Sequence, residues 1–229
     1  MTGTKHRDER MSTARHTIAH LIATNFYGGP EKQIIEHLVR LRSKQYRGIV
    51  LSFIENGSPN EILKKSESVG LDHYGIPMSG PVDLSALRKT IRTISDTKTD
   101  LLCVHGYKSI IFGWCIKICQ GIPVIAFSRG YTAENKKVAF YEWMERRFIG
   151  RLDGIISVSE GQRKRLAELG VRTKREWVVH NAALLNGNQA GLHPDLRDAV
   201  CRRLDVPIEG KLVVSAGRLS PEKGHVHLV

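Results

Sequence analysis

The stretch GIISVSEGQRKRLAEL, at residues 154–169, contains the pattern from which the fold class is predicted. Its first five residues form a short apolar run, which is typical of a strand that helices bury on both faces. Ser159 follows as a helix N-cap, and Glu160 stands in the first turn, where an acidic side chain is favourable. The stretch therefore predicts a buried strand that passes directly into a helix.

The same unit recurs along most of the chain. The predicted strands are 16–23, 47–53, 73–78, 101–105, 123–127, 154–158 and 177–179. Helical patterns separate them, at 61–68, 109–120, 135–149 and 160–169, together with one through Ile34, Leu38 and Leu41 and one that begins at Asp83. This alternation implies βαβ units with right-handed crossovers. The predicted fold class is α/β, a Rossmann-like parallel sheet with helices on both faces.

The pattern changes after residue 180. We expect residues 1–15 to be a disordered leader, 16–180 to be the first domain, and 181–210 to be a linker with a connecting helix at 195–204. A new strand is predicted at 211–216, followed by a loop and the first turn of a helix. These elements are too few to bury a core. Residues 211–229 are therefore predicted to be the truncated start of a second Rossmann-like domain.

The composition favours anionic partners. Lysine and arginine number 35 against 23 acidic residues, a net charge of +12. Such a balance is typical of proteins that meet a membrane surface, a phosphorylated substrate or a nucleic acid. No apolar run approaches the roughly 18–20 residues that a membrane-spanning helix needs.

The four cysteines indicate a reducing compartment. Three of the four (Cys103, Cys115, Cys119 and Cys201) lie in apolar runs, where a thiol packs as a small hydrophobe. No His or Cys pair stands at a zinc-finger spacing. A cytoplasmic location fits best, with peripheral binding to the inner face of the cell membrane as an extension of it.

The loop GRLSPEKG, at residues 217–224, resembles the loop that opens the second domain of family 4 retaining glycosyltransferases, which have the GT-B fold. The resemblance implies that Arg218 and Lys223 contact the diphosphate of a sugar nucleotide. Two cations there would offset the charge that grows on the leaving group. The alternative is a solvated turn with ordinary surface charges.

The segment FYGGPE, at residues 26–31, is similar to the Gly-Gly-x-Glu turn after the first strand of that family. The resemblance implies acceptor-side roles for Gly28, Gly29 and Glu31. Paired glycines let the backbone approach a ligand, and the helix N-terminus beyond Pro30 can bind an anion. The turn lacks the third glycine of a dinucleotide fingerprint, and a purely structural role is the alternative.

Two further strands end in residues that the resemblance assigns to the acceptor side. LLCVHGY, at 101–107, ends the fourth strand at His105, and IPVIAFSRGY, at 122–131, carries Arg129 where relatives often have a histidine. An arginine cannot deprotonate a hydroxyl at neutral pH. Arg129 is therefore interpreted as a clamp for an acceptor phosphate, with a structural salt bridge as the competing role, and the departing phosphate could take the proton. A structural histidine is the alternative at His105.

The segment after Arg129 resembles a subgroup associated with bacterial exopolysaccharide or cell-surface glycan assembly. The likeness runs from about Thr17 to the end of the chain, although the family's Glu-x7-Glu segment lies beyond Val229. At the crossover between domains the chain keeps Asn181 but lacks the Pro and Gly of its relatives.

The helix expected near 135–151 interleaves aromatic and basic residues. This composition suits a bilayer interface, where rings lie among headgroups and cations meet anionic lipid. Burial of the aromatic residues against the domain is an equally weighted alternative, because periodicity does not separate the two.

The function implied by the resemblance is transfer of a hexose or related sugar from a nucleotide-diphosphate donor to an acceptor hydroxyl, with retention of configuration. The expected partners are the sugar nucleotide as co-substrate, a glycan or polyprenyl-phosphate-linked acceptor and an anionic membrane surface. No other cofactor, no nucleic acid and, for want of an Asp-x-Asp pair, no metal is expected. The 229 residues alone are expected to be inactive. A non-catalytic binding module and a sugar-nucleotide 2-epimerase on the same plan remain as alternatives.

Overall fold

The computed structural model describes residues 16–55, 57–80, 83–130, 136–182, 194–211, 213, 215, 217 and 224–228, without the side chains of 137, 138, 194 and 195. The chain divides into two compact units, residues 1–181 and 182–229. The first unit holds the sheet and is described first.

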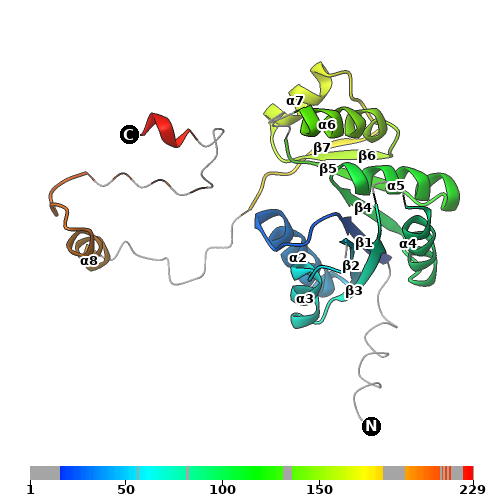
Figure 1. Cartoon of the computed structure of the whole chain (residues 1–229), viewed down its shortest axis with the longest axis horizontal. Coiled ribbons are helices and arrows are strands. Elements are labelled where there is room, and N and C mark those ends of the chain that lie inside the picture. Colours follow the sequence, from blue (N-terminus) through cyan, green and yellow to red (C-terminus); the bar gives the residue numbers. More distant parts are fainter. Residues whose placement is uncertain are drawn as a thin grey trace, which may run out of the picture. The chain divides into compact units, whose positions relative to one another are not determined.

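The first unit is built on a seven-stranded sheet in the order β3-β2-β1-β4-β5-β6-β7 (Figure 1). Every neighbouring pair of strands in it is parallel. The strands are β1 His16–Ile22, β2 Tyr46–Glu55, β3 Asp72–Met78, β4 Leu101–His105, β5 Val124–Ser128, β6 Gly154–Ser157 and β7 Glu176–Val178. All seven predicted strands are confirmed, with small differences at their ends.

One α-helix connects each strand to the next. The helices are α2 Gly29–Leu41, α3 Glu61–Ser68, α4 Leu84–Asp96, α5 Tyr107–Gln120, α6 Lys136–Ile149 and α7 Glu160–Glu168, and a short 3-10 turn, η1 Arg42–Lys44, follows α2. Figure 1 shows α2 and α3 on one side of the sheet and α4 and α5 on the other. The predicted α/β fold, with helices on both faces of a parallel sheet, is confirmed.

Polar side chains begin three of these helices. Asp83 accepts a hydrogen bond from the backbone N–H of Ala86, at 2.9 Å. Ser159 accepts one from Gln162, at 3.1 Å. Asn60 caps α3 in the same manner. These bonds satisfy backbone donors that have no partner inside the helix, which is why the chain turns from extended to helical at these points.

Close helix packing fixes the position of the strand ends. A Cβ atom placed on Gly113 of α5 would lie 2.7 Å from Cγ1 of Val104, so a glycine is needed for α5 to approach β4. Val104 is fully buried on that face of the sheet. Because successive side chains of a strand alternate between faces, His105 points to the opposite face, which α2 partly covers.

The strand order reverses between β1 and β4. From β1 the chain adds β2 and β3 on one edge, then returns to add β4 to β7 on the other. In open α/β sheets, ligands bind beside the carboxyl ends of the strands at such a reversal. The end of β4, with His105, lies at this point.

The second unit, residues 182–229, contains helix α8 Pro194–Leu204, which agrees with the helix predicted at 195–204, and a short 3-10 turn, η4 His225–His227. Cys201 of α8 is buried. Within the predicted strand 211–216 the described residues are 211, 213 and 215, and these three are not in a strand. The predicted start of a second Rossmann-like domain stays a prediction, and the predicted leader, 1–15, lies outside the described residues.

Candidate functional site

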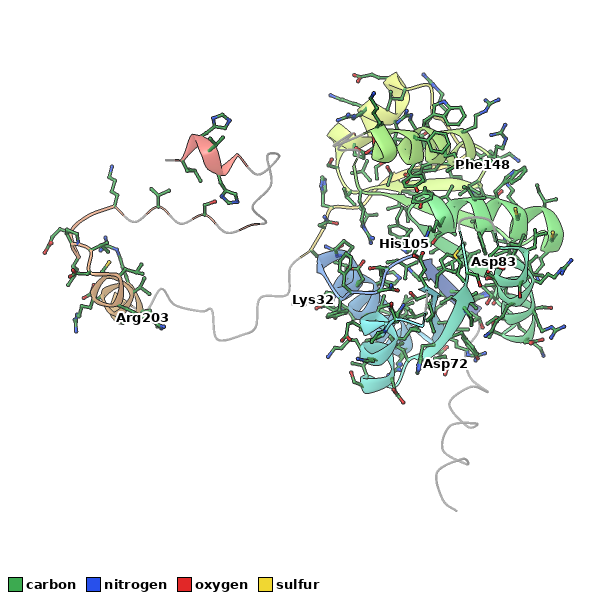
Figure 2. All side chains as sticks on the ribbon, viewed as in Figure 1. Lys32, Asp72, Asp83, His105, Phe148 and Arg203 are labelled. Atoms are coloured by element: carbon green, nitrogen blue, oxygen red, sulfur yellow. The ribbon has the colours of Figure 1, made fainter. Side chains whose placement is uncertain are left out.

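Two buried histidines meet where the strand order reverses. Nδ1 of His20, in β1, lies 2.9 Å from Nε2 of His105, at the end of β4. The ring centroids are 5.1 Å apart with an angle of 20° between the ring planes, and both side chains are almost fully buried. Figure 2 shows His105 in the middle of the first unit. The two residues are 85 positions apart in the sequence, so the sheet topology alone brings them together.

Other side chains extend this pair on the same face. The ring of His37, from α2, lies 5.6 Å from that of His20. Phe127 of β5 stacks on His105 at 4.7 Å, and the guanidinium carbon of Arg129 lies 5.8 Å from the centre of the Phe127 ring. Side chains from β1, β4, β5 and α2 therefore form one contiguous group, which we call the histidine cluster: His20, His37, His105, Phe127 and Arg129.

Burial keeps the two central histidines neutral. It lowers the pKa of His20 and of His105 well below the usual value, and the nearby charges of His37 and Arg129 lower both further. His37 is exposed at the surface of α2, and partial desolvation still lowers its pKa. A hydrogen bond between two neutral imidazoles has one donor and one acceptor. The direction of this bond decides which nitrogen of each ring carries the proton.

The second ring nitrogen of each of these two histidines can form a further hydrogen bond. Nε2 of His20 and Nδ1 of His105 are buried and have no hydrogen-bond partner among the described residues. If His20 donates to His105, then His105 carries its proton on Nδ1 and can donate to a ligand. If His105 donates, its Nδ1 is a lone-pair acceptor that can take a proton. His105 can therefore act either as a hydrogen-bond donor to a ligand or as a proton acceptor.

Glu31 closes the glycine turn at the start of α2. The backbone N–H of Gly28 donates to Oε2 of Glu31, at 2.9 Å, and Glu31 is buried. A Cβ atom on Gly28 would lie 3.1 Å from that oxygen, whereas one on Gly29 would meet nothing within 4 Å. The turn is therefore held by the carboxylate at Gly28 and open at Gly29.

Arg129 combines a positive charge with partial burial. Burial lowers the pKa of the Arg129 guanidinium, and the negative charge of Glu31 acts in the opposite direction. Arginine stays protonated at neutral pH even so. Its buried Nε has no hydrogen-bond partner among the described residues. A partly desolvated cation of this kind is suited to bind an anion, since charge-assisted hydrogen bonds strengthen as water is excluded.

A buried hydrogen bond holds the loop that carries Arg129. Gln162 of α7 donates from Nε2 to Oγ of Ser128, at 2.8 Å, and both side chains are buried. The bond ties the end of β5 to α7. It thereby fixes the backbone immediately before Arg129.

The structure brings together part of the site predicted from the sequence. Glu31, His105 and Arg129 lie at the same edge of the sheet, with the Gly28–Gly29 turn beside Glu31. Arg218 and Lys223 lie outside the described residues. The sequence reasoning missed three members of the histidine cluster: His20, His37 and Phe127. A signal for His20 was present, because it is the one polar residue inside the apolar run IAHLI.

Over the residues that the structure describes, no group of three or more His, Cys, Asp or Glu side chains could hold a metal ion. In the same residues no helix is long and apolar enough to cross a membrane.

Solved structures with a similar fold include a glycosyltransferase, a UDP-N-acetylglucosamine 2-epimerase and a protein in complex with UDP-glucose. HepE from Anabaena, in complex with UDP-glucose, matches with a TM-score of 0.70 and 17% identity, over 92% of this chain and 55% of that one. A glycosyltransferase from Rickettsia africae matches with a TM-score of 0.68 and 16% identity, over 92% of this chain and 55% of that one. The UDP-GlcNAc 2-epimerase of Methanocaldococcus jannaschii matches with a TM-score of 0.50 and 16% identity, over 72% of this chain and 45% of that one. At these identities the likeness shows the fold.

The chain spans about half the length of these solved structures. No curated protein matches the sequence. A family model described as Glycosyltransferase Family 4 matches residues 27–183. This range covers more than half of the chain, including strands β2 to β7. The chain therefore belongs to glycosyltransferase family 4.

Proposed function

We propose that the protein transfers a sugar from a nucleotide-diphosphate donor to an acceptor hydroxyl with retention of configuration, and that the sugar is a hexose or close relative. Membership of family 4 supports the transferase class. The complex of HepE with UDP-glucose supports a donor of this chemical type. Retention rests on the likeness of the loop 217–224 to that of retaining relatives, where Arg218 and Lys223 would neutralise the leaving diphosphate.

One observation carries the acceptor side of this proposal. The histidine cluster leaves three buried polar atoms without partners in the described residues: Nε2 of His20, Nδ1 of His105 and Nε of Arg129. Unpaired buried polar groups are costly, so a ligand that pairs with them gains binding energy. Arg129 would bind a phosphate of the acceptor, and His105 would hydrogen-bond the acceptor hydroxyl.

A phosphate on the acceptor favours a polyprenyl-phosphate-linked substrate over a neutral glycan. Such an acceptor is consistent with sugar transfer at the inner face of the cell membrane. It is also consistent with assembly of cell-surface polysaccharide or glycolipid, as the subgroup likeness implies. We propose also that the 229 residues alone do not catalyse transfer, since they span about half the length of the solved structures.

The test is a transfer assay on the protein expressed with any coding sequence that follows Val229. It is incubated with UDP-glucose or another nucleotide sugar and a short-chain polyprenyl phosphate, and the lipid is analysed by mass spectrometry. Proton NMR of the product reports the anomeric configuration. The proposal expects a glycosylated lipid, with transfer lowered at least about tenfold by Arg129→Gln, since a charge-assisted hydrogen bond is lost.

The matched control is Arg163→Gln on α7, where the side chain is half exposed and pairs with Glu160 at 2.8 Å. It should leave transfer unchanged. An inverted product contradicts retention, and equal effects of the two variants contradict the role of Arg129.

The second candidate is a sugar-nucleotide 2-epimerase. The likeness to the 2-epimerase fold favours it, although with a lower TM-score than that of HepE. Conversion of the donor to its 2-epimer, without transfer to any acceptor, would establish this alternative. A protein that neither binds nor converts any nucleotide sugar would be a binding module.

A further inference from the structure

Helix α6 presents a stripe of side chains that the proposed reaction does not use. The exposed residues among its described side chains are Lys136, Phe140, Trp143 and Arg147. Their spacing of four, three and four places them on one face of the helix. Arg151, four residues further on, is also exposed. We call these five residues the α6 stripe.

The aromatic pair of the stripe is exposed, although other aromatic rings of the same helix pack against α5. Phe140 and Trp143 are each 54% exposed, and their rings stack at 5.9 Å with an angle of 23° between planes. The neighbouring Tyr141 turns inward and stacks on Tyr107 of α5 at 4.2 Å. Phe148, labelled in Figure 2, packs against α5 as well. The sequence left burial and exposure of the aromatics as alternatives, and the helix combines both.

The charges of the stripe have one sign. Three of its five members are basic and none is acidic. The acidic residues of the helix, Glu142 and Glu145, are half-buried and lie off the stripe. Arg151 is held near the helix end, because its guanidinium donates to the carbonyl of Arg147 and lies 5.6 Å from the Phe148 ring centre. Aromatic and cationic groups therefore share one exposed face.

We infer that the α6 stripe docks on an anionic lipid bilayer. Aromatic rings partition to the level of the headgroups, and lysine and arginine flanking them contact lipid phosphates. The long basic side chains can reach outward while the ring pair enters the interface. The inference goes beyond the proposed function, because docking requires neither sugar donor nor acceptor.

Vesicle sedimentation of the 229-residue chain tests the inference. Binding should occur on vesicles of phosphatidylcholine with phosphatidylglycerol, and not on phosphatidylcholine alone. It should weaken between about 0.1 M and about 1 M salt, where the Debye length falls from about 10 Å to about 3 Å. Lys136→Gln/Arg147→Gln/Arg151→Gln should lower the partition coefficient about 100-fold, at about fivefold for each basic residue. Phe140→Ser/Trp143→Ser should lower it at least about tenfold.

Two matched controls separate the stripe from the general surface. Arg88→Gln/Lys89→Gln/Arg92→Gln removes the same charge from exposed positions of α4, and Leu84→Ser/Ile118→Ser removes two exposed apolar side chains. Each control should keep the partition coefficient within about twofold of the wild type, because surface potential acts within a Debye length. Circular dichroism melting curves check that all variants fold.

A residue-specific readout comes from tryptophan fluorescence. The emission should shift to the blue when anionic vesicles are added, and Trp143→Phe should remove most of the shift while binding persists. Arg129→Gln should bind vesicles as the wild type does, so that failure of the proposed reaction and failure of docking are told apart.

Four outcomes would overturn the inference. The wild type could stay in the supernatant over anionic vesicles at low salt, or could bind neutral vesicles equally well. The α4 charge variant could lose as much binding as the α6 variant, which would mean that net charge alone attracts the protein. Sedimentation velocity could show a dimer that Phe140→Ser/Trp143→Ser dissociates, which would assign the stripe to self-association.

Discussion

Nδ1 of His20 and Nε2 of His105 are 2.9 Å apart, and burial holds both imidazoles in the neutral form. The pair joins the first strand of the sheet to the fourth at the reversal of strand order. When the pH is below the usual histidine pKa, both side chains are protonated in the unfolded chain, whereas the folded protein keeps them uncharged. This relationship makes the stability of the first unit dependent on pH.

The first prediction concerns this pH dependence. The folded pKa of each histidine is depressed, so in acid the unfolded state binds protons that the folded state does not. The contribution to stability is present above the unfolded pKa of about 6.5 and is lost as pH falls below it, at about 1.4 kcal/mol per pH unit for each histidine. His20→Gln and His105→Gln should each reduce the slope of the free energy of unfolding between pH 6 and pH 5 by about that amount.

Urea denaturation at a series of pH values measures the slope. His16→Gln is the control, since the side chain of His16 is 60% exposed. A slope that neither buried variant changes would show that the pair titrates alike in both states. Nitrogen-15 NMR of the wild type should show that both rings become protonated only at a pH well below the usual histidine pKa.

The second prediction concerns anion binding by Arg129. A short-chain polyprenyl phosphate, titrated into the 229-residue chain, should shift the NMR signals of residues at the ends of β4 and β5. Arg129→Gln should weaken the affinity at least about tenfold, because a charge-assisted hydrogen bond contributes about 1.5–3 kcal/mol. Arg129→Lys should keep part of the affinity, since it keeps the charge but loses the planar fork. Equal affinity in all three proteins would rule out the clamp.

The third prediction concerns the bond between Gln162 and Ser128. Ser128→Ala should destabilise the first unit by about 1–3 kcal/mol, because the buried amide of Gln162 loses its partner. Ser128→Ala/Gln162→Leu should cost less than the sum of the single changes, since it removes both polar groups. Ser68→Ala, at an exposed site on α3, should stay within about 0.5 kcal/mol. Additive losses would show that the two side chains do not interact.

The fourth prediction compares two glycines that both face open space. Gly106 stands between His105 and α5 with φ of +80° and ψ of 165°, a conformation that suits glycine alone. Gly106→Ala should therefore cost about 1–3 kcal/mol although its Cβ would touch nothing. Gly29→Ala, which also meets nothing within 4 Å, should be neutral within about 0.5 kcal/mol. Thermal unfolding of the two variants measures the change in stability. A similar loss of stability in both variants would count against backbone strain at Gly106.

Much of the first unit could be predicted because its signals are local. Each strand is a short apolar run, and caps such as Asp83 and Ser159 mark the start of helices within a few residues. Such features depend on neighbours in the sequence, so reading the chain suffices. The predicted helix 160–169 and α7 differ by a single residue for this reason.

The histidine cluster could be predicted only in part, because it depends on which strands become neighbours. His105 was predicted from the family resemblance of the strand that it ends. His20 was not, because its partner is 85 residues away and only the reversal between β1 and β4 brings them together. For α6, periodicity could not decide which aromatic residues face α5, since that depends on where Tyr107 stands on the neighbouring helix.

The central position of β1 has a consequence for synthesis of the protein on the ribosome. The first strand of the sheet ends up between β2 and β4. Each residue of β4 is translated 83 residues after its partner in β1, as Cys103 is after His20. At about 5–20 residues per second, one edge of β1 has no partner strand for on the order of ten seconds. An unpaired edge invites pairing with another nascent chain. Slower translation between Ile22 and Leu101 should therefore increase aggregation, and a chaperone that covers exposed strands should act before β4 emerges.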